Sequence, residues 1–180
     1  VEVVEEEGGL VDAVFSQICA MDRTDEADLA TVLVVDPSFD DNFDGFIRVC
    51  DDVVEAAIQA TGATALVGRA WFHPRYATPI DGKDDALRPG HAIPPTWAAR
   101  YFRQYYPDDV HVDDRAIAQA NDRIRHTPHA TVNLLRRSQL VAAKQKEDAS
   151  PLKKPNAIYA RNVARDLLLR GGGPAAPREL

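Results

Sequence analysis

The feature that most constrains the fold is a strand-like segment followed closely by a long amphipathic helix pattern. Residues 31–35 read Thr-Val-Leu-Val-Val, a β-branched run that predicts a strand buried on both faces. After Asp36-Pro37, apolar side chains recur on one helical stripe: Phe43, Phe46, Ile47, Cys50, Val53, Val54, Ala57 and Ile58. Gly62 stands where a C-terminal helix cap belongs. A strand and a helix in this order favour folds that pack helices on a sheet.

The rest of the chain continues the alternation of strands and helices. Further strands are predicted over 1–4, 64–72 and 130–135, and further helices over 10–21, 96–106, 113–125 and 156–170, with a basic helix or turn reaching about residue 146. This order predicts an α/β (α+β) fold, a two-layer sandwich of a small sheet with helices, plus a long insert and a C-terminal helix. We expect residues 1–170 to form one domain and 171–180 to be a mobile tail.

The predicted insert, residues 75–112, has a composition of its own. It is rich in proline, and eight of the chain's thirteen aromatic residues lie between 71 and 106. A connection this long is usually functional or disordered, and its aromatic content argues against disorder. Aromatic side chains often dominate binding interfaces, so the insert supplies the candidates for partner binding. They are Trp97, Tyr101, Phe102, Tyr105 and Tyr106.

The net charge of −7 hides a strong asymmetry along the sequence. Residues 1–70 hold sixteen acidic and three basic side chains, whereas residues 123–180 hold four acidic and twelve basic ones. The two ends can neutralise each other in the folded chain, or the basic part can form a face for an acidic partner. Nucleic acid is not expected as a partner, because the basic part lacks interleaved aromatics and the whole chain is acidic. No apolar run approaches the roughly 20 residues of a membrane span.

The cysteines and histidines give little support to metal chemistry. Cys19 and Cys50 both fall on apolar helix faces, so we expect two buried free thiols. His126 and His129 are three residues apart, but a metal would need three or four converging ligands. Further ligands are available in His111, Asp113 and Asp114, although nothing in the sequence fixes their geometry. A phosphate-binding glycine loop is absent too, so we expect neither a metal nor a cofactor.

His73 is the histidine best placed for a ligand pocket, because it follows a predicted strand. It could act as a general base, or it could simply cap local backbone groups. A pocket there would include arginines suited to an anionic ligand. The candidate pocket residues are His73, Arg75, Tyr76, Arg125, His126 and Arg136.

Five segments, taken in order, resemble an uncharacterised family catalogued as domain of unknown function 1415. The segments are Thr31–Val35 with Asp36-Pro37, Asn42–Phe46, Phe72–Tyr76, Thr127–Arg136 and Ile158–Asn162. The resemblance covers most of residues 29–170. Members occur mainly in bacteria and in some photosynthetic eukaryotes. No activity is established for the family, so the resemblance implies a fold rather than a reaction.

The chain also departs from the family pattern. Its Arg125-His126 stands where members usually have Asn-Arg, and Asn133 stands where they have histidine. Members carry a Leu-Cys-Pro-Phe segment upstream of where Val1 begins, and they lack the insertion near 80–112. Loss of polar positions together with gain of an aromatic segment indicates a small-molecule protein reused for binding.

These observations lead to two alternative functions. The first is a non-catalytic accessory or docking subunit of a larger protein assembly, peripheral to an organellar membrane complex. The absence of an initiator methionine and the family's distribution favour the chloroplast, with a photosystem as first choice, and the mitochondrion as second, rather than secretion. The alternative is an enzyme or small-molecule-binding protein that holds an anionic ligand near His73. An enzyme requires the six pocket candidates to converge in one cleft, whereas a docking subunit requires an insert that projects from the domain.

Overall fold

A computed structural model of the chain describes residues 1–4, 9–79, 86–106, 112–148 and 157–170. The predicted tail, 171–180, lies outside these ranges, as do residues 80–85 and 107–111 of the insert. The chain divides into two compact units. Unit 1 contains residues 1–76 and 126–145, and unit 2 contains residues 77–125 and 146–180. The insert predicted at 75–112 therefore belongs almost entirely to unit 2.

Unit 1 is built on a four-stranded sheet. Its strands are β1 (Glu2–Val3), β2 (Thr31–Val35), β3 (Val67–Phe72) and β4 (Thr131–Arg136). Their order across the sheet is β1-β2-β4-β3. Strand β1 runs parallel to β2, whereas β4 is antiparallel to both of its neighbours. The last strand in the sequence therefore lies between β2 and β3, and joins segments that are about 60 to 100 residues apart.

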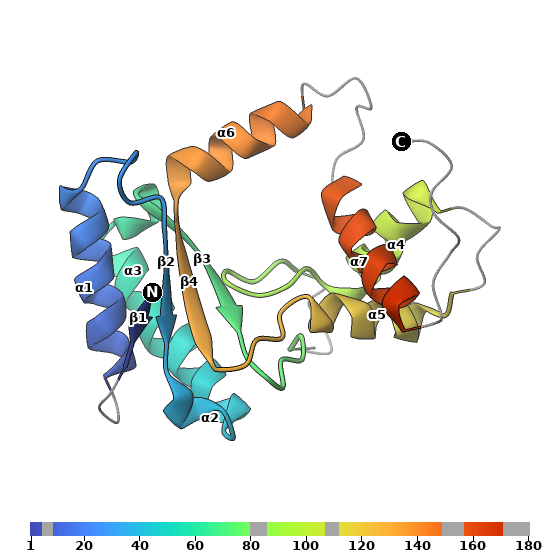
Figure 1. Cartoon of the computed structure of the whole chain (residues 1–180), viewed down its shortest axis with the longest axis horizontal. Helices are drawn as coiled ribbons and strands as arrows, with labels where there is room; N and C mark the ends of the chain where they lie inside the picture. Colours follow the sequence, from blue (N-terminus) through green and yellow to red (C-terminus); the bar gives the residue numbers. More distant parts are fainter. Residues whose placement is uncertain (5–8, 80–85, 107–111, 149–156, 171–180) are drawn as a thin grey trace. The chain divides into compact units, whose positions relative to one another are not determined.

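Helices cover one face of this sheet, as Figure 1 shows for α1 and α3. The helical elements of unit 1 are α1 (Leu10–Arg23), the short turn Pro37–Phe39, α2 (Phe43–Arg48), the π-helical turns Val49–Val54, α3 (Glu55–Ala60), the short turn Ala63–Ala65 and most of α6 (Arg137–Asp148). The buried side chains between the two layers include Val14, Val34, Phe46, Trp71 and Leu134. The predicted two-layer α+β sandwich is confirmed.

The long amphipathic stripe forms one continuous helical segment with a π-helical centre. Phe46, Cys50, Val54 and Ile58 are fully buried at a constant spacing of four residues. An ordinary helix, with 3.6 residues per turn, would rotate such a series off its face, and the wider turns over Val49–Val54 keep it aligned. Val53, which the stripe included, is 45% exposed as a result.

Two predictions about burial were wrong. Strand β2 is not buried on both faces, because Val32 and Val34 are buried while Leu33 between them is 37% exposed. The β-branched run does not reveal that the helices of unit 1 leave Leu33, on the other face of β2, partly uncovered. Cys19 is exposed and only Cys50 is buried. On α1, Ile18 and Met21 take the inward positions, which turns Cys19 outward.

Unit 2 has a separate apolar core formed by three helices. They are α4 (Pro95–Tyr105), α5 (Asp114–Arg123) and α7 (Ala157–Leu169). Asp113 caps α5, since its carboxylate accepts a hydrogen bond from the Arg115 N–H at 3.1 Å. The core contains Ala98, Ala99, Phe102, Tyr106, Val112, Ile117, Ala120, Ala160, Val163, Ala164 and Leu167. Arg123 of α5 joins Asp166 of α7, with 2.8 Å between Nε and Oδ2.

Within the described ranges, no helix combines the length and the apolar character needed to cross a membrane.

Candidate functional site

His73 lies at the end of β3 and is fully buried. Its Nε2 lies 2.9 Å from the Phe39 carbonyl oxygen, and its Nδ1 accepts a hydrogen bond from the Arg75 N–H at 2.9 Å. A carbonyl accepts and an N–H donates, so these contacts fix the neutral tautomer with its proton on Nε2. The rings of Phe43 and Phe46 lie 5.1 and 5.5 Å from the imidazole. His73 thus caps backbone groups, which was one of its two interpretations, and no nitrogen is left for a ligand.

Three other pocket candidates lie near His73. The Tyr76 N–H donates to the His73 carbonyl oxygen at 3.1 Å, and His126 Nε2 lies 3.1 Å from the Tyr76 carbonyl oxygen. Tyr76 is buried and its ring packs against Phe43. Arg75 is exposed and its Nη2 lies 3.3 Å from Asp41 Oδ1. These contacts hold the turn after β3 together.

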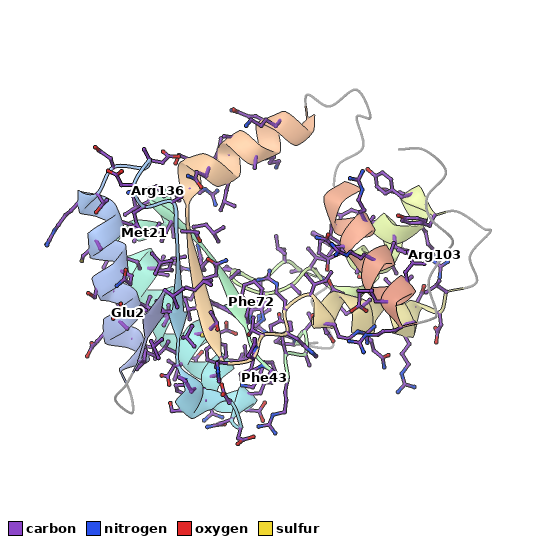
Figure 2. The ribbon with its side chains drawn as sticks, in the orientation of Figure 1. Glu2, Met21, Phe43, Phe72, Arg103 and Arg136 are labelled. Atoms are coloured by element: carbon purple, nitrogen blue, oxygen red, sulfur yellow. The ribbon has the colours of Figure 1, made fainter. Side chains whose placement is uncertain are left out.

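Arg136 lies at the opposite end of the sheet from His73. In the strand register Phe72 pairs with Thr131, whereas Arg136 pairs with Val67. Five residues of strand span roughly 17 Å. Figure 2 shows Phe72 and Arg136 at these two ends.

The Arg136 side chain binds backbone carbonyls around the end of α1. Its Nη2 donates to Met21 at 2.6 Å and also to Thr24, and its Nε donates to Leu29 at 2.8 Å. Arg125, the remaining candidate, belongs to unit 2, where its Nη2 donates to the His91 carbonyl oxygen at 3.1 Å. Because Arg136 lies at the far end of the sheet from His73, the five candidates of unit 1 do not share one site.

A polar pair of Asp40 and His129, at the same end of the sheet as His73, was not predicted. His129 Nδ1 lies 2.7 Å from Asp40 Oδ2, and Asp40 Oδ1 accepts a hydrogen bond from the Ala130 N–H at 2.8 Å. Burial alone would raise the pKa of the Asp40 carboxyl. The hydrogen bonds from His129 and Ala130, together with the charge of His129, outweigh burial and lower that pKa below its usual value. The sequence pattern indicated His129 only as a potential metal ligand, and it indicated no role for Asp40.

The partner-binding candidates on α4 separate into two groups. Phe102 and Tyr106 stack with 4.8 Å between ring centroids and lie in the core of unit 2, where no partner can reach them. Tyr105 is partly buried and packs against the same core. Trp97 and Tyr101 belong neither to this core nor to the residues packed against it. Both are half-buried, as Tyr105 is, so part of each ring remains open to another molecule.

Trp97 and Tyr101 form a cluster with Arg100, which sequence reasoning missed. The two rings lie edge to face with 6.4 Å between their centroids. The Arg100 guanidinium carbon lies 5.6 Å from the Trp97 ring centroid and 5.5 Å from that of Tyr101. Both distances are within the range of cation–π attraction. The signal that could have found Arg100 is its position three residues after Trp97 and one before Tyr101. We refer to Trp97, Arg100 and Tyr101 as the α4 ridge.

No set of three or more His, Cys, Asp or Glu side chains in the described part of the chain is arranged to hold a metal ion. Comparison with protein-family models, with curated proteins and with solved structures found no match to this chain.

Proposed function

We propose that this chain is a non-catalytic accessory subunit that binds another protein through the α4 ridge. The observation that carries this proposal is that Trp97 and Tyr101, which are half-buried, lie outside the core of unit 2 and beside the exposed Arg100. Trp, Tyr and Arg are the residue types that most often contribute the large energies in protein interfaces.

The energetics of the ridge support binding rather than folding. Because Trp97 and Tyr101 are only half-buried, each ring forgoes part of the stabilisation that full burial would give. A partner that covers Trp97 and Tyr101 would recover it, at low entropic cost because each ring has few rotatable bonds. The contacts with Arg100 already limit the motion of both rings, so less ordering is left to the binding step.

The contacts of the predicted pocket residues give little support to an enzyme. His73 has both nitrogens bound to backbone groups, and Arg136 is committed to three carbonyls near the end of α1. A general base needs a free lone pair within reach of its substrate. The proposal also narrows the docking surface that the sequence indicated, since Phe102 and Tyr106 contribute to folding.

The assembly that contains this subunit is part of the same proposal. From the resemblance to domain of unknown function 1415, we look for it first in a photosynthetic complex of the chloroplast and second in the mitochondrion. The chain would be a peripheral subunit there.

The test compares native co-purification with the wild-type chain and with a Trp97→Ala/Tyr101→Ala variant in source tissue. Mass spectrometry should identify a defined set of proteins at stoichiometric amounts with the wild type, and the double variant should lose them. The control is Gln104→Ala, because Gln104 is exposed on the same helix and outside the ridge. Circular dichroism of each variant establishes that α4 has kept its fold. Equal recovery with the double variant, or a wild type that purifies alone, would refute the proposed function.

A further inference from the structure

We infer that the α4 ridge recognises a carboxylate on its partner, within an acidic segment of another protein. This inference rests on the proposed function and specifies the chemistry of the partner. Its starting point is the guanidinium of Arg100, which carries a full positive charge at the surface of α4 and stands beside two aromatic rings.

What distinguishes Arg100 from other arginines of unit 2 is its place beside two aromatic rings. It also lacks an ion pair with a described carboxylate, a property that it shares with Arg115, Arg161 and Arg165. Arg103 on the same helix pairs with Asp114 at 2.5 Å. Arg123 pairs with Asp166 at 2.7 Å, and Arg170 contacts the same carboxylate at 3.5 Å. Among the residues that the structure describes, no carboxylate pairs with Arg100. Its planar fork of N–H donors can therefore bind both oxygens of a carboxylate that comes from outside.

The two rings would strengthen such a contact. A guanidinium stacked on aromatic faces loses less rotamer freedom when it binds than a free arginine does. Once a partner covers the ridge, the two rings would help to shield the ion pair from water and raise its strength above that of an exposed surface pair. An apolar neighbour of the carboxylate on the partner could then cover Trp97 and Tyr101.

The net charge of the protein favours an acidic protein segment over a nucleic acid or a membrane as the partner. Unit 2 holds fourteen basic and twelve acidic residues, whereas unit 1 holds seven basic and sixteen acidic ones. With a net charge of only +2 on the unit that carries the ridge, and of −7 on the whole chain, the protein lacks the wide basic surface that the phosphate array of a nucleic acid or an anionic membrane would require. One arginine between two rings suits a local carboxylate, which requires no wide basic surface.

The inference can be tested on the full chain with synthetic peptides as probes. One fluorescein-labelled peptide alternates glutamate with leucine, and a matched peptide has glutamine in place of each glutamate. Fluorescence anisotropy should show that the glutamate peptide binds at least about tenfold more tightly than the glutamine peptide at low salt. Added salt should reduce this preference, because it screens the ion pair. Arg100→Gln should abolish the preference, whereas Arg103→Gln, the same change of charge on the same helix, should preserve it.

The outcomes distinguish this inference from the proposed function. Trp97→Ala should weaken the binding of both peptides, since both carry the leucines that would cover the ring. Equal binding of the two peptides, binding of neither, or a preference that survives Arg100→Gln would overturn the acidic partner. Arg100-dependent binding to phosphatidylserine vesicles or to single-stranded DNA, in preference to the glutamate peptide, would overturn it as well. The docking role itself stands or falls with the co-purification lost in Trp97→Ala/Tyr101→Ala.

Discussion

His129 Nδ1 lies 2.7 Å from Asp40 Oδ2, although 89 residues separate the two in the sequence. The second oxygen of Asp40 accepts the Ala130 N–H at 2.8 Å. Asp36, just after β2, adds a backbone bond from its own N–H to the Ala130 carbonyl oxygen at 2.9 Å. These contacts join the segment after β2 to the residues that lead into β4. The two strands are neighbours in the sheet but are about 100 residues apart in the sequence, so no short loop connects them.

The first prediction concerns how the stability that Asp40 provides through these contacts depends on pH. The folded state lowers the pKa of Asp40, so it favours the ionised carboxylate. This contribution to stability is fully present above the usual pKa of 3.8 and is lost as pH falls through the lower folded value. Asp40→Asn should remove this dependence and cost about 1–2 kcal/mol at neutral pH, from the hydrogen bonds to His129 and Ala130. Urea unfolding between pH 2 and 7 measures it.

The reporter for this experiment is Trp71, which is fully buried in unit 1. A Trp97→Phe background leaves Trp71 as the only tryptophan of the chain. Asp44→Asn is the control, because Asp44 is exposed nearby in the first turn of α2. A wild-type stability curve with the same slope as that of Asp40→Asn below pH 4 would contradict the prediction.

Arg136 supplies the second prediction, which concerns the end of α1. Its guanidinium is a cation buried against three carbonyl oxygens, at a helix terminus that carries partial negative charge. Arg136→Met keeps most of the volume but leaves these carbonyls without their donors. We expect a loss of about 2–4 kcal/mol in unfolding free energy. Urea unfolding followed by Trp71 fluorescence measures it, and Arg137→Met, an exposed neighbour, should change stability by less than about 0.5 kcal/mol.

The contacts of Asp40 and Arg136 show which parts of the structure could be predicted from the sequence. Helices and strands depend on neighbouring residues, so the stripe that starts at Phe43 and the left-handed cap at Gly62, with φ of 72°, were visible in the pattern. The partners of Asp40 and Arg136 lie about 90 to 115 residues away. Their residue types fit several roles, and Arg136 was predicted to be part of an anion pocket. Only the register of β4 between β2 and β3 determines which role is realised.

Which side chains of a helix or strand are buried was also predicted less well, because burial depends on elements that are distant in the sequence. A β-branched run such as Thr31–Val35 has the same local pattern whether one or two layers cover the strand. In the same way, an aromatic residue on an amphipathic helix can face the core or a partner. Phe102 and Trp97 are five residues apart on α4, and only the packing of α5 and α7 against the helix assigns the first to the core and leaves the second outside it.

The third prediction uses the different environments of the two cysteines. Cys50 is fully buried, and burial together with the neighbouring charge of Asp51 raises the pKa of its thiol well above the usual value. Alkylation requires an accessible thiolate. Iodoacetamide at pH 8 should therefore modify Cys19 rapidly and Cys50 only after denaturation. Mass spectrometry of tryptic peptides over time measures both rates, with Cys19→Ser as the control. Modification of both cysteines at similar rates in the native protein would contradict the buried position of Cys50.

The final prediction concerns the ion pair between Glu55 of α3 and Arg69 of β3. Both side chains are only 11% exposed, and the guanidinium binds both carboxylate oxygens, with 2.6 Å between Nε and Oε2. Removing one member leaves a charge in the interface between helix and sheet. Glu55→Leu and Arg69→Met should each cost about 3 kcal/mol, whereas the double variant Glu55→Leu/Arg69→Met should cost much less than the sum. Urea unfolding of the three variants, followed by Trp71 fluorescence, measures this coupling. Additive losses would show that the two charges are stabilised separately, each by water or by other groups.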